Sequence, residues 1–241
     1  MKKYIAISFA FAAALLLGAC GKQEYKLSVF DTCLGKQYAS NPECLAKAKE
    51  LGFDGVQLSS WYKPGGVFMS DELIAKYNAK KAETGMETPS IVVPNLPFVG
   101  NPDCARFMKS AIDAAAKLNA KTILVAFFGK LKLSDENKKL VEANFEPVVS
   151  ALKQIMPYAE QKGILVCMEN TLSADDNIRV INAVGSPNLK VYFDVFNIVY
   201  YGHEEVSSIE KLKGKIGEVH LKDKGHSFLA AARLSWHRCS R

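Results

Sequence analysis

Short apolar stretches alternate with longer amphipathic stretches along most of the chain. The short stretches are rich in β-branched and aromatic residues and are bounded by glycine, proline or asparagine, which is typical of strands. The longer stretches have helical length, and several follow a residue that can cap a helix. The pattern predicts strands over 26–30, 55–59, 90–93, 122–127, 164–168, 189–193 and 218–219, and helices over 42–51, 70–83, 103–118, 135–161, 174–184 and 204–212.

This alternation favours a parallel sheet with helices packed against it. A doubly wound sheet is one candidate, but residues 31–35, after the first strand, lack its glycine-rich phosphate-binding turn. In a later strand Val191 and Phe193 share one face, and Tyr192 and Asp194 share the other. Apolar residues facing outer helices and polar residues facing a lumen are typical of a barrel. We therefore expect an α/β fold of the TIM (β/α)8 type that is incomplete, with about seven strands and the last βα unit missing.

Three of the predicted strands end in a residue that can bind a metal. These residues are Glu169, Asp194 and His220, and they follow one another at intervals of 25 and 26 residues. Each interval fits one strand and one helix, so the three side chains are expected at the same end of successive strands. Two carboxylates and an imidazole suit Mn²⁺, Co²⁺, Mg²⁺ or Zn²⁺, and the residue types do not choose among these ions. The alternative is three unrelated polar strand ends.

The N-terminal residues have the pattern of an export signal. Met1–Lys3 is positively charged, and an apolar stretch too short to favour a spanning helix follows it. The sequence Leu-Gly-Ala-Cys-Gly that ends this stretch resembles a bacterial lipobox, in which Cys20 is lipidated. We expect an exported lipoprotein, anchored to a membrane through Cys20 on the periplasmic side of the outer membrane or at the cell surface. The alternatives are an ordinary signal peptide and a short membrane anchor. The expected divisions are a signal peptide over 1–19, a tether over 20–24 and one domain over 25–241.

The charge pattern argues against a nucleic-acid partner. The formal net charge is only +6. The lysines are scattered over predicted helices, and no basic stripe is interleaved with aromatic residues. We therefore expect a small molecule, and not DNA or RNA, as the partner.

Four segments together resemble the xylose isomerase-like TIM-barrel superfamily, in particular its sugar phosphate isomerase/epimerase branch. The resemblance covers roughly residues 25–236. The segments are Phe-Asp-Gly-Val-Gln-Leu over 53–58, Met-Glu-Asn over 168–170, Phe-Asp-Val-Phe-Asn over 193–197 and Glu-Val-His-Leu-Lys-Asp over 218–223.

The resemblance implies a sugar isomerase or epimerase that uses a divalent metal. Glu169, Asp194 and His220 match three of the family's metal ligands, and Glu169 also matches its first catalytic base. In the family this base removes a proton next to the carbonyl of a keto sugar and leaves an enediolate. The family's fourth ligand, a second glutamate that returns the proton, has no counterpart because no glutamate follows His220. We therefore expect a truncation or frameshift near residue 229, and weak activity.

Five further residues are considered for contacts in or near the pocket. Asn197 is either a contact to sugar hydroxyls or a turn residue, and Trp61 is either a platform for a sugar ring or an ordinary core or surface aromatic. Lys222 and His226 follow His220 and are candidates for substrate binding, and the alternative for His226 is a simple loop residue. Glu218 is expected to face the lumen below His220, with Lys190 or Lys222 as its partner.

Three functions remain open at this point. The first is a metal-dependent isomerase or epimerase of a keto sugar. The second is a non-catalytic carbohydrate-binding lipoprotein, or a truncated pseudoenzyme of the same fold. The third is the apurinic-endonuclease branch of the superfamily, whose trinuclear zinc site needs more histidines than the four in this chain. The mild charge and the export signal also argue against the third.

Overall fold

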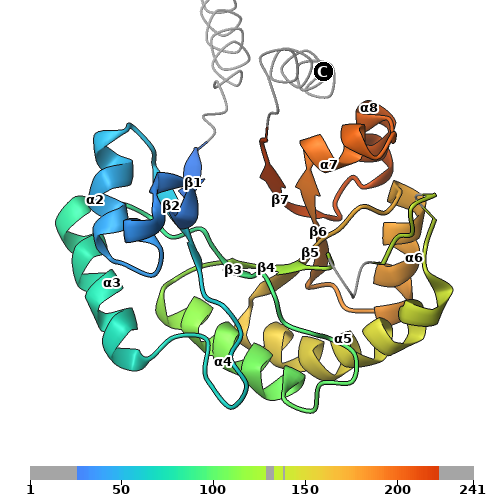
Figure 1. Cartoon of the computed structure of the whole chain (residues 1–241), viewed down its shortest axis with the longest axis horizontal. Coiled ribbons are helices and arrows are strands. Elements are labelled where there is room, and N and C mark those ends of the chain that lie inside the picture. The colour runs from blue at the N-terminus through green and yellow to red at the C-terminus, as the bar shows by residue number, and fades with distance from the viewer. Residues whose placement is uncertain (1–25, 129–132, 138, 223–241) are drawn as a thin grey trace, which may run out of the picture.

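The computed structural model of the chain describes residues 26–128, 133–137 and 139–222 (Figure 1). Its sheet has seven strands in the order β1-β2-β3-β4-β5-β6-β7, and each neighbouring pair is parallel. The strands are β1 (Ser28–Phe30), β2 (Gly55–Ser59), β3 (Ser90–Val93), β4 (Thr122–Ala126), β5 (Leu165–Glu169), β6 (Leu189–Asp194) and β7 (Ile216–His220).

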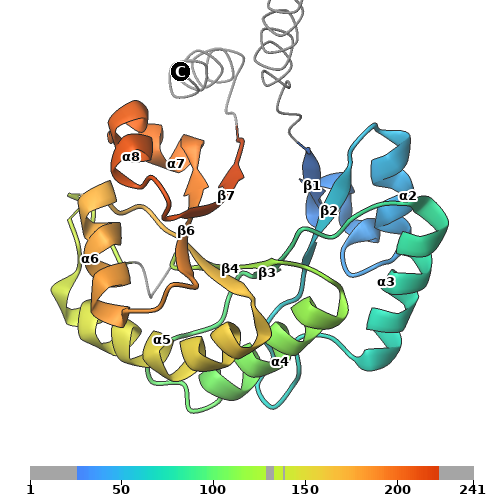
Figure 2. The same cartoon turned by 180° about the vertical axis from the view of Figure 1, so that it is seen from behind.

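The sheet curls so that β1 and β7 face each other across an open side, and the helices cover its outer surface (Figures 1 and 2). Within the described residues, β1 and β7 each pair with only one other strand. The prediction of an incomplete TIM-type barrel with seven strands is therefore confirmed. The predicted signal peptide, tether and Cys20, together with His226 and residue 229, lie outside the described residues.

Seven α-helices connect or follow the strands in the described part of the chain. Ser70 and Ser173 cap α3 and α6, whose bounds are given below, by each accepting a hydrogen bond from the backbone. The helices are α2 (Glu43–Glu50), α3 (Asp71–Thr84), α4 (Cys104–Lys117), α5 (Glu142–Lys162), α6 (Ala174–Val184), α7 (Val195–Tyr200) and α8 (Glu205–Lys211), and two short 3₁₀ turns, Asp31–Leu34 and Lys36–Tyr38, precede them.

The observed helices differ from the predicted ones in one boundary and in one additional helix. Helix α5 begins at Glu142 rather than near residue 135, because Ser134 and Leu140 form an isolated antiparallel bridge ahead of it. The same helix continues through Pro147 and Pro157 without interruption. Helix α7 follows β6 directly and was not expected, because its six residues are too few to show a helical period.

The sheet has an apolar core on each face. The larger core lies between the strands and the helices and includes Ile91, Ile123 and Val191. A smaller cluster is formed by strand residues of the opposite, inner face, namely Val92, Leu124, Cys167 and Tyr192. Cys167 and Tyr192 of this cluster lie two residues before Glu169 and Asp194 on the same strands, so the polar strand ends share the inner face with it. In the described part of the chain, no helix has the length and hydropathy needed to cross a membrane.

Candidate active site

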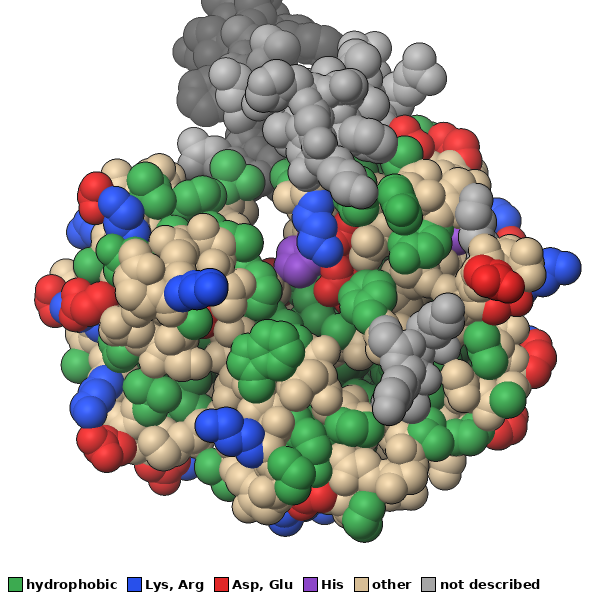
Figure 3. All heavy atoms as spheres, viewed as in Figure 1, with side chains coloured by type: hydrophobic (Ala, Val, Ile, Leu, Met, Phe, Trp, Pro, Cys, Tyr) green, Lys and Arg blue, Asp and Glu red, His purple; other side chains and the backbone are tan. Residues whose placement is uncertain are grey.

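The structure brings the three predicted metal ligands together at the C-terminal ends of β5, β6 and β7. One ligand atom from each of Glu169, Asp194 and His220 lies within 4.8 Å of the other two. Glu169 and Asp194 are only 5% and 2% exposed, and the His220 side chain is 20% exposed. Figure 3 shows acidic, basic and histidine side chains gathered in the hollow in the middle of this face, with hydrophobic side chains beside them.

A bulge in β7 sets the position of His220. Val191 pairs with Ile216, but the next residue, Tyr192, pairs with Glu218, so Gly217 is an extra residue in the ladder. The bulge shifts the rest of β7 by one residue and places His220 opposite Asp194. Without that shift, the histidine would point to the other face of the sheet, because strand side chains alternate.

Glycine is required at the bulge because the strands pack closely there. A Cβ atom on Gly217 would lie 2.4 Å from Cys167 Sγ and 3.1 Å from Lys190 Cβ. Real Cβ atoms do not approach other heavy atoms so closely, so any other residue would push β7 away from the inner face. Gly217 thus allows the site to form although it carries no chemistry itself.

Lys222 supplies a positive charge to the same cluster. Its Nζ atom lies 3.0 Å from Glu169 Oε1 and 2.5 Å from Asp194 Oδ2. His220 Nδ1 is 3.4 Å from Glu169 Oε1 and 3.7 Å from Asp194 Oδ2. Two buried carboxylates are therefore balanced by one ammonium and one imidazole, and Lys222 holds the place between them that a cation would take.

The pKa values of the cluster reflect this charge balance. Burial opposes ionisation of Asp194, but contacts with its polar neighbours, His220 foremost, outweigh it and hold the pKa of Asp194 below its usual range. Burial lowers the pKa of His220, but Asp194 and Glu169 more than compensate and raise it to about 9. The pKa of Lys222 is likewise raised by the two carboxylates in spite of burial. In this arrangement the cluster holds paired charges at neutral pH.

Asn197 lies in the cluster, as predicted. Its backbone N–H donates to Asp194 Oδ1 over 2.9 Å, which caps the first turn of α7. Its side-chain Nδ2 lies 3.5 Å from Glu169 Oε1, at the limit of a hydrogen bond. Asn197 is therefore a turn residue at the start of α7, and the same turn places its side-chain amide beside Glu169, where it can also contact a sugar hydroxyl.

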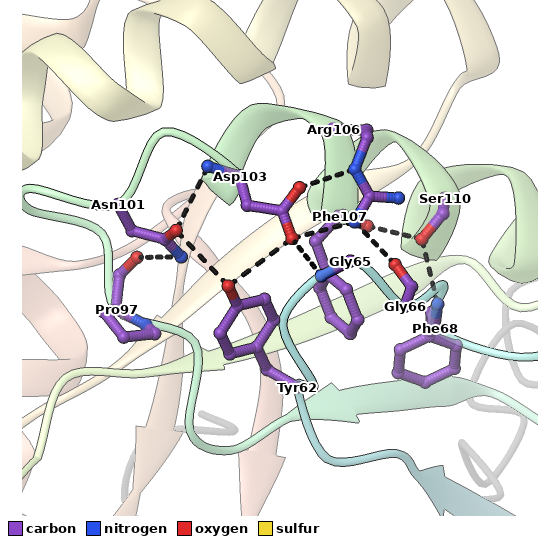
Figure 4. Close-up of polar contacts among 10 residues, drawn as sticks. All are labelled: Tyr62, Gly65, Gly66, Phe68, Pro97, Asn101, Asp103, Arg106, Phe107 and Ser110. Carbon is purple, nitrogen blue, oxygen red and sulfur yellow. Dashed lines mark hydrogen bonds and ion pairs between the residues drawn. The ribbon is translucent and has the colours of Figure 1, made fainter.

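Trp61 is on the loop that follows β2, and its side chain is 57% exposed. The loop is tied to the start of α4 by the carboxylate of Asp103 (Figure 4). This carboxylate accepts from Gly65 N over 3.1 Å and from Arg106 Nε and Nη2 over 2.5 and 2.8 Å. Arg106 Nη2 also donates to the carbonyl of Gly66 over 2.7 Å. Trp61 is thus an exposed aromatic residue next to a segment, Gly65 and Gly66, that hydrogen bonds hold against α4.

Sequence reasoning missed Gln57 and assigned the wrong partners to Glu218. His220 Nε2 lies 3.0 Å from Gln57 Oε1, a contact between residues 163 positions apart. Glu218 accepts from Ser90 Oγ over 2.9 Å, whereas Lys190 donates to a backbone carbonyl and Lys222 reaches the cluster above. Gln57 lies within one of the four segments that resemble the family, but no local pattern connected it with the distant histidine.

The donor set fits a divalent cation. Two carboxylates and one imidazole are ligands that Mn²⁺, Co²⁺ and Zn²⁺ accept, and carboxylates also suit Mg²⁺. Asp194 Oδ2 is buried and receives no hydrogen bond of acceptable geometry, although the Lys222 ammonium lies beside it. A buried carboxylate oxygen that faces positively charged groups and accepts no hydrogen bond of good geometry is suited to a metal.

Comparisons with known proteins agree with the fold. Residues 45–238 match the family described as Xylose isomerase-like TIM barrel. The chain is 25% identical over 194 residues to 2-epi-5-epi-valiolone 7-phosphate 2-epimerase of Actinoplanes sp., covering 76% of this chain and 68% of that protein.

Solved structures of epimerases share the fold. An L-ribulose 3-epimerase superimposes with a TM-score of 0.71 at 18% identity, over 90% of this chain and 79% of that chain. D-Psicose 3-epimerase from Clostridium cellulolyticum H10, solved with D-tagatose, gives a TM-score of 0.68 at 19% identity, over 86% and 81% of the two chains. The 3-keto-D-glucoside 4-epimerase of E. coli gives a TM-score of 0.68 at 15% identity, over 88% of each chain. Because the family match spans most of the sequence, the chain belongs to the Xylose isomerase-like TIM barrel family.

Proposed function

We propose that this chain is a divalent-metal-dependent epimerase or isomerase of a keto sugar. The observation that carries the proposal is the convergence of Glu169, Asp194 and His220 within 4.8 Å at the open end of the half-barrel. The similarity to sugar epimerases supports the class of reaction. No glycine-rich phosphate loop follows the first strand, which favours a free sugar or glycoside over a sugar phosphate.

Glu169, Asp194 and His220 would hold the cation. Bound there, it would polarise the sugar carbonyl and make the neighbouring C–H group more acidic. Glu169 is the base in this proposal, and it removes the proton from that carbon to leave an enediolate. Glu169 lies on one face of the sugar, so its return of the proton to the adjacent carbon would give isomerisation. Epimerisation would require an acid on the opposite face to supply a proton there.

The remaining predicted residues would orient the sugar. Asn197 presents its amide beside Glu169, where it can bind a hydroxyl group next to the reacting carbon. Lys222 can move from the carboxylates to the sugar oxygens, because its side chain is 47% exposed. Trp61 offers an exposed ring on which a sugar face can stack.

The ion pairs of Lys222 favour a second candidate, a carbohydrate-binding protein or pseudoenzyme that uses no metal. With its ammonium between the two carboxylates, the pocket is electrically balanced without a cation. The pocket would then bind a sugar through hydrogen bonds and would not exchange its protons.

The two candidates differ in metal content and in proton exchange. The metal content of the purified soluble chain (residues 21–241) would be compared with that of a Glu169→Gln/His220→Ala double variant and of Glu72→Gln, an exposed control on α3. Keto sugars would then be incubated with the Mn²⁺-treated chain in D₂O. We expect near-stoichiometric metal in the wild type and in the control, and none in the double variant. We also expect the wild type to introduce deuterium into the sugar next to its carbonyl. A folded chain with neither metal nor exchange would favour the second candidate.

We also propose that the protein is exported and anchored through a lipid on Cys20. The sequence from 1 to 21 supports this proposal, as argued above. Metabolic labelling with a radioactive fatty acid is expected to label the wild type and not Cys20→Ala. Equal labelling of both proteins, or none of either, would contradict it.

A further inference from the structure

Behind the three ligands, a series of hydrogen bonds runs through the inner face of the half-barrel. Its centre is Gln57 on β2, which is 3% exposed. Gln57 Nε2 lies 2.9 Å from Ser90 Oγ and 2.7 Å from the hydroxyl of Tyr192. Ser90 Oγ in turn donates to Glu218 Oε1 over 2.9 Å. Gln57 Oε1 lies on the other side, 3.0 Å from His220 Nε2.

The orientation of the Gln57 amide follows from this series. The hydroxyl proton of Ser90 is used in the bond to Glu218, so the oxygen of Ser90 is left to accept a proton from Gln57. The second N–H of the amide points to Tyr192. A flipped amide would place its carbonyl against Ser90 Oγ and leave its N–H groups facing the histidine. The carbonyl of Gln57 therefore faces His220.

This orientation determines which nitrogen of His220 is free. A carbonyl oxygen can only accept, so His220 Nε2 must carry a proton. Whenever the ring is neutral, as it is when it binds a metal, the nitrogen on the other side of the ring, Nδ1, then has the lone pair. Nδ1 is the atom that faces Glu169 Oε1 at 3.4 Å and Asp194 Oδ2 at 3.7 Å. The ring is also held by Tyr192, whose centroid lies 4.4 Å away.

We propose that Gln57 is a positioning residue for the metal site, which selects the Nε2–H form of His220 and aims Nδ1 at the cation. The proposal rests on the proposed function, since it concerns the ligand atom of the same site. Ser90 and Glu218 act one and two steps behind Gln57 by keeping its amide from flipping. Hydrogen-bond partners that orient a metal-binding histidine commonly change metal affinity by about 10- to 100-fold when they are removed.

The first measurement uses Zn²⁺, which is diamagnetic, and calorimetric titration. Gln57→Leu gives an apolar side chain one atom shorter and removes the acceptor, and Gln57→Glu keeps the length and an acceptor for Nε2–H. The matched control is Gln154→Leu on the exposed side of α5. We expect Gln57→Leu to bind zinc about 10- to 100-fold more weakly than the wild type. Gln57→Glu and the control are expected to bind zinc with near-normal affinity. Equal affinity in Gln57→Leu and the wild type overturns the proposal and leaves the proposed function standing.

A second measurement needs no substitution in β2. ¹⁵N NMR spectra of the wild type labelled at histidine, with His220→Gln used to assign the signals, distinguish an N–H nitrogen from a nitrogen with a free lone pair. Because the carboxylates raise the pKa of His220 to about 9, the metal-free chain is measured above that pH, where the ring is neutral. The neutral ring is expected to carry its only proton on Nε2, both there and with Zn²⁺ bound. A proton on Nδ1 in the metal-free chain overturns the inference. If the wild type binds no metal but keeps the Nε2 proton, the proposed function fails while the orientation by Gln57 holds.

Discussion

The ammonium nitrogen of Lys222 lies 2.5 Å from Asp194 Oδ2, in the position between the carboxylates where a metal ligand set would place its cation. A divalent ion and this ammonium cannot occupy the same space, and their charges repel each other. Lys222→Gln is therefore expected to bind Mn²⁺ about tenfold more tightly than the wild type, since one competing charge is removed. Calorimetric titration of Lys222→Arg, which keeps the charge, is the control. Weaker binding by Lys222→Gln would show that the lysine supports the metal and does not compete with it.

Asp194 is expected to be the most sensitive of the three ligands in the folding of the metal-free chain. Its loss removes one of the two carboxylates that His220 and Lys222 contact, and Asp194→Ala also removes the cap of α7. Breaking a buried ion pair from one side costs about 3–5 kcal/mol of unfolding free energy. Urea denaturation would measure this loss. Asp175→Asn, in an exposed ion pair with Lys211, is expected to change stability little, and an equal effect of both would be evidence against a buried charge cluster.

Gly217 is expected to tolerate a side chain only when Cys167 is shortened. Gly217→Ala places a Cβ atom 2.4 Å from Cys167 Sγ, so β7 must move, at a cost of about 1–3 kcal/mol in unfolding free energy. In Cys167→Ala the sulfur is absent, and the same glycine substitution is expected to cost much less. A double-mutant cycle of unfolding free energies checks this coupling. Additive effects of the two substitutions would argue against the close contact.

Asp31 gives the protein a dependence of stability on pH. Burial raises the pKa of this carboxyl above its ordinary value of 3.8, although Ser59 and Ser40 donate hydrogen bonds to it. A carboxyl with a higher pKa in the folded state stabilises the fold fully below its unfolded pKa, and that contribution is lost as the pH rises through the folded pKa. Asp31→Asn has no charge to bury. The unfolding free energy of the wild type minus that of Asp31→Asn should therefore fall as the pH rises above the ordinary carboxyl pKa of 3.8.

Asp31→Ala separates the hydrogen bonds of this residue from its charge. This variant leaves the backbone N–H of Ser59 without its acceptor at every pH, so it is expected to lose about 2 kcal/mol or more throughout the range. Chemical denaturation of the three proteins at several pH values makes the comparison. A wild-type advantage over Asp31→Asn that grew with pH would contradict the sign argued here.

Asp103 is expected to control the mobility of Trp61 without affecting the cluster. Its carboxylate joins the segment after β2 to α4 through Gly65 and Arg106 (Figure 4). In a Trp236→Phe background, Trp61 is the remaining tryptophan, so fluorescence anisotropy reports on this loop alone. Asp103→Ala is expected to lower the anisotropy and to leave Mn²⁺ affinity unchanged. Unchanged anisotropy would mean that the loop is held by other contacts, such as the one from Phe68 N to Ser110 Oγ.

The sequence alone was sufficient to predict the architecture and the convergence of Glu169, Asp194 and His220. Hydrophobic alternation is a local property, so the strands and most helices were found near their observed positions. The spacing of Glu169, Asp194 and His220 repeats once per strand-helix unit, and parallel strands in sequential order place such residues at one end of the barrel. The start of α5 was missed because the bridge between Ser134 and Leu140 delays it. The short α7 was missed because its start depends on a cap by the side chain of Asp194.

Only the tertiary structure determined how Glu169, Asp194 and His220 are oriented toward one another and which residues form hydrogen bonds to them. The bulge at Gly217 depends on the space left by Cys167 and Lys190 on two other strands, so β7 by itself does not reveal it. The contact between Gln57 and His220 joins residues 163 positions apart, and Lys222 reaches the carboxylates of β5 and β6 from beyond the end of β7. Sequence periodicity fixes the side of a strand on which a residue lies, whereas register and hydrogen-bond partners depend on packing between strands that the curled sheet brings together.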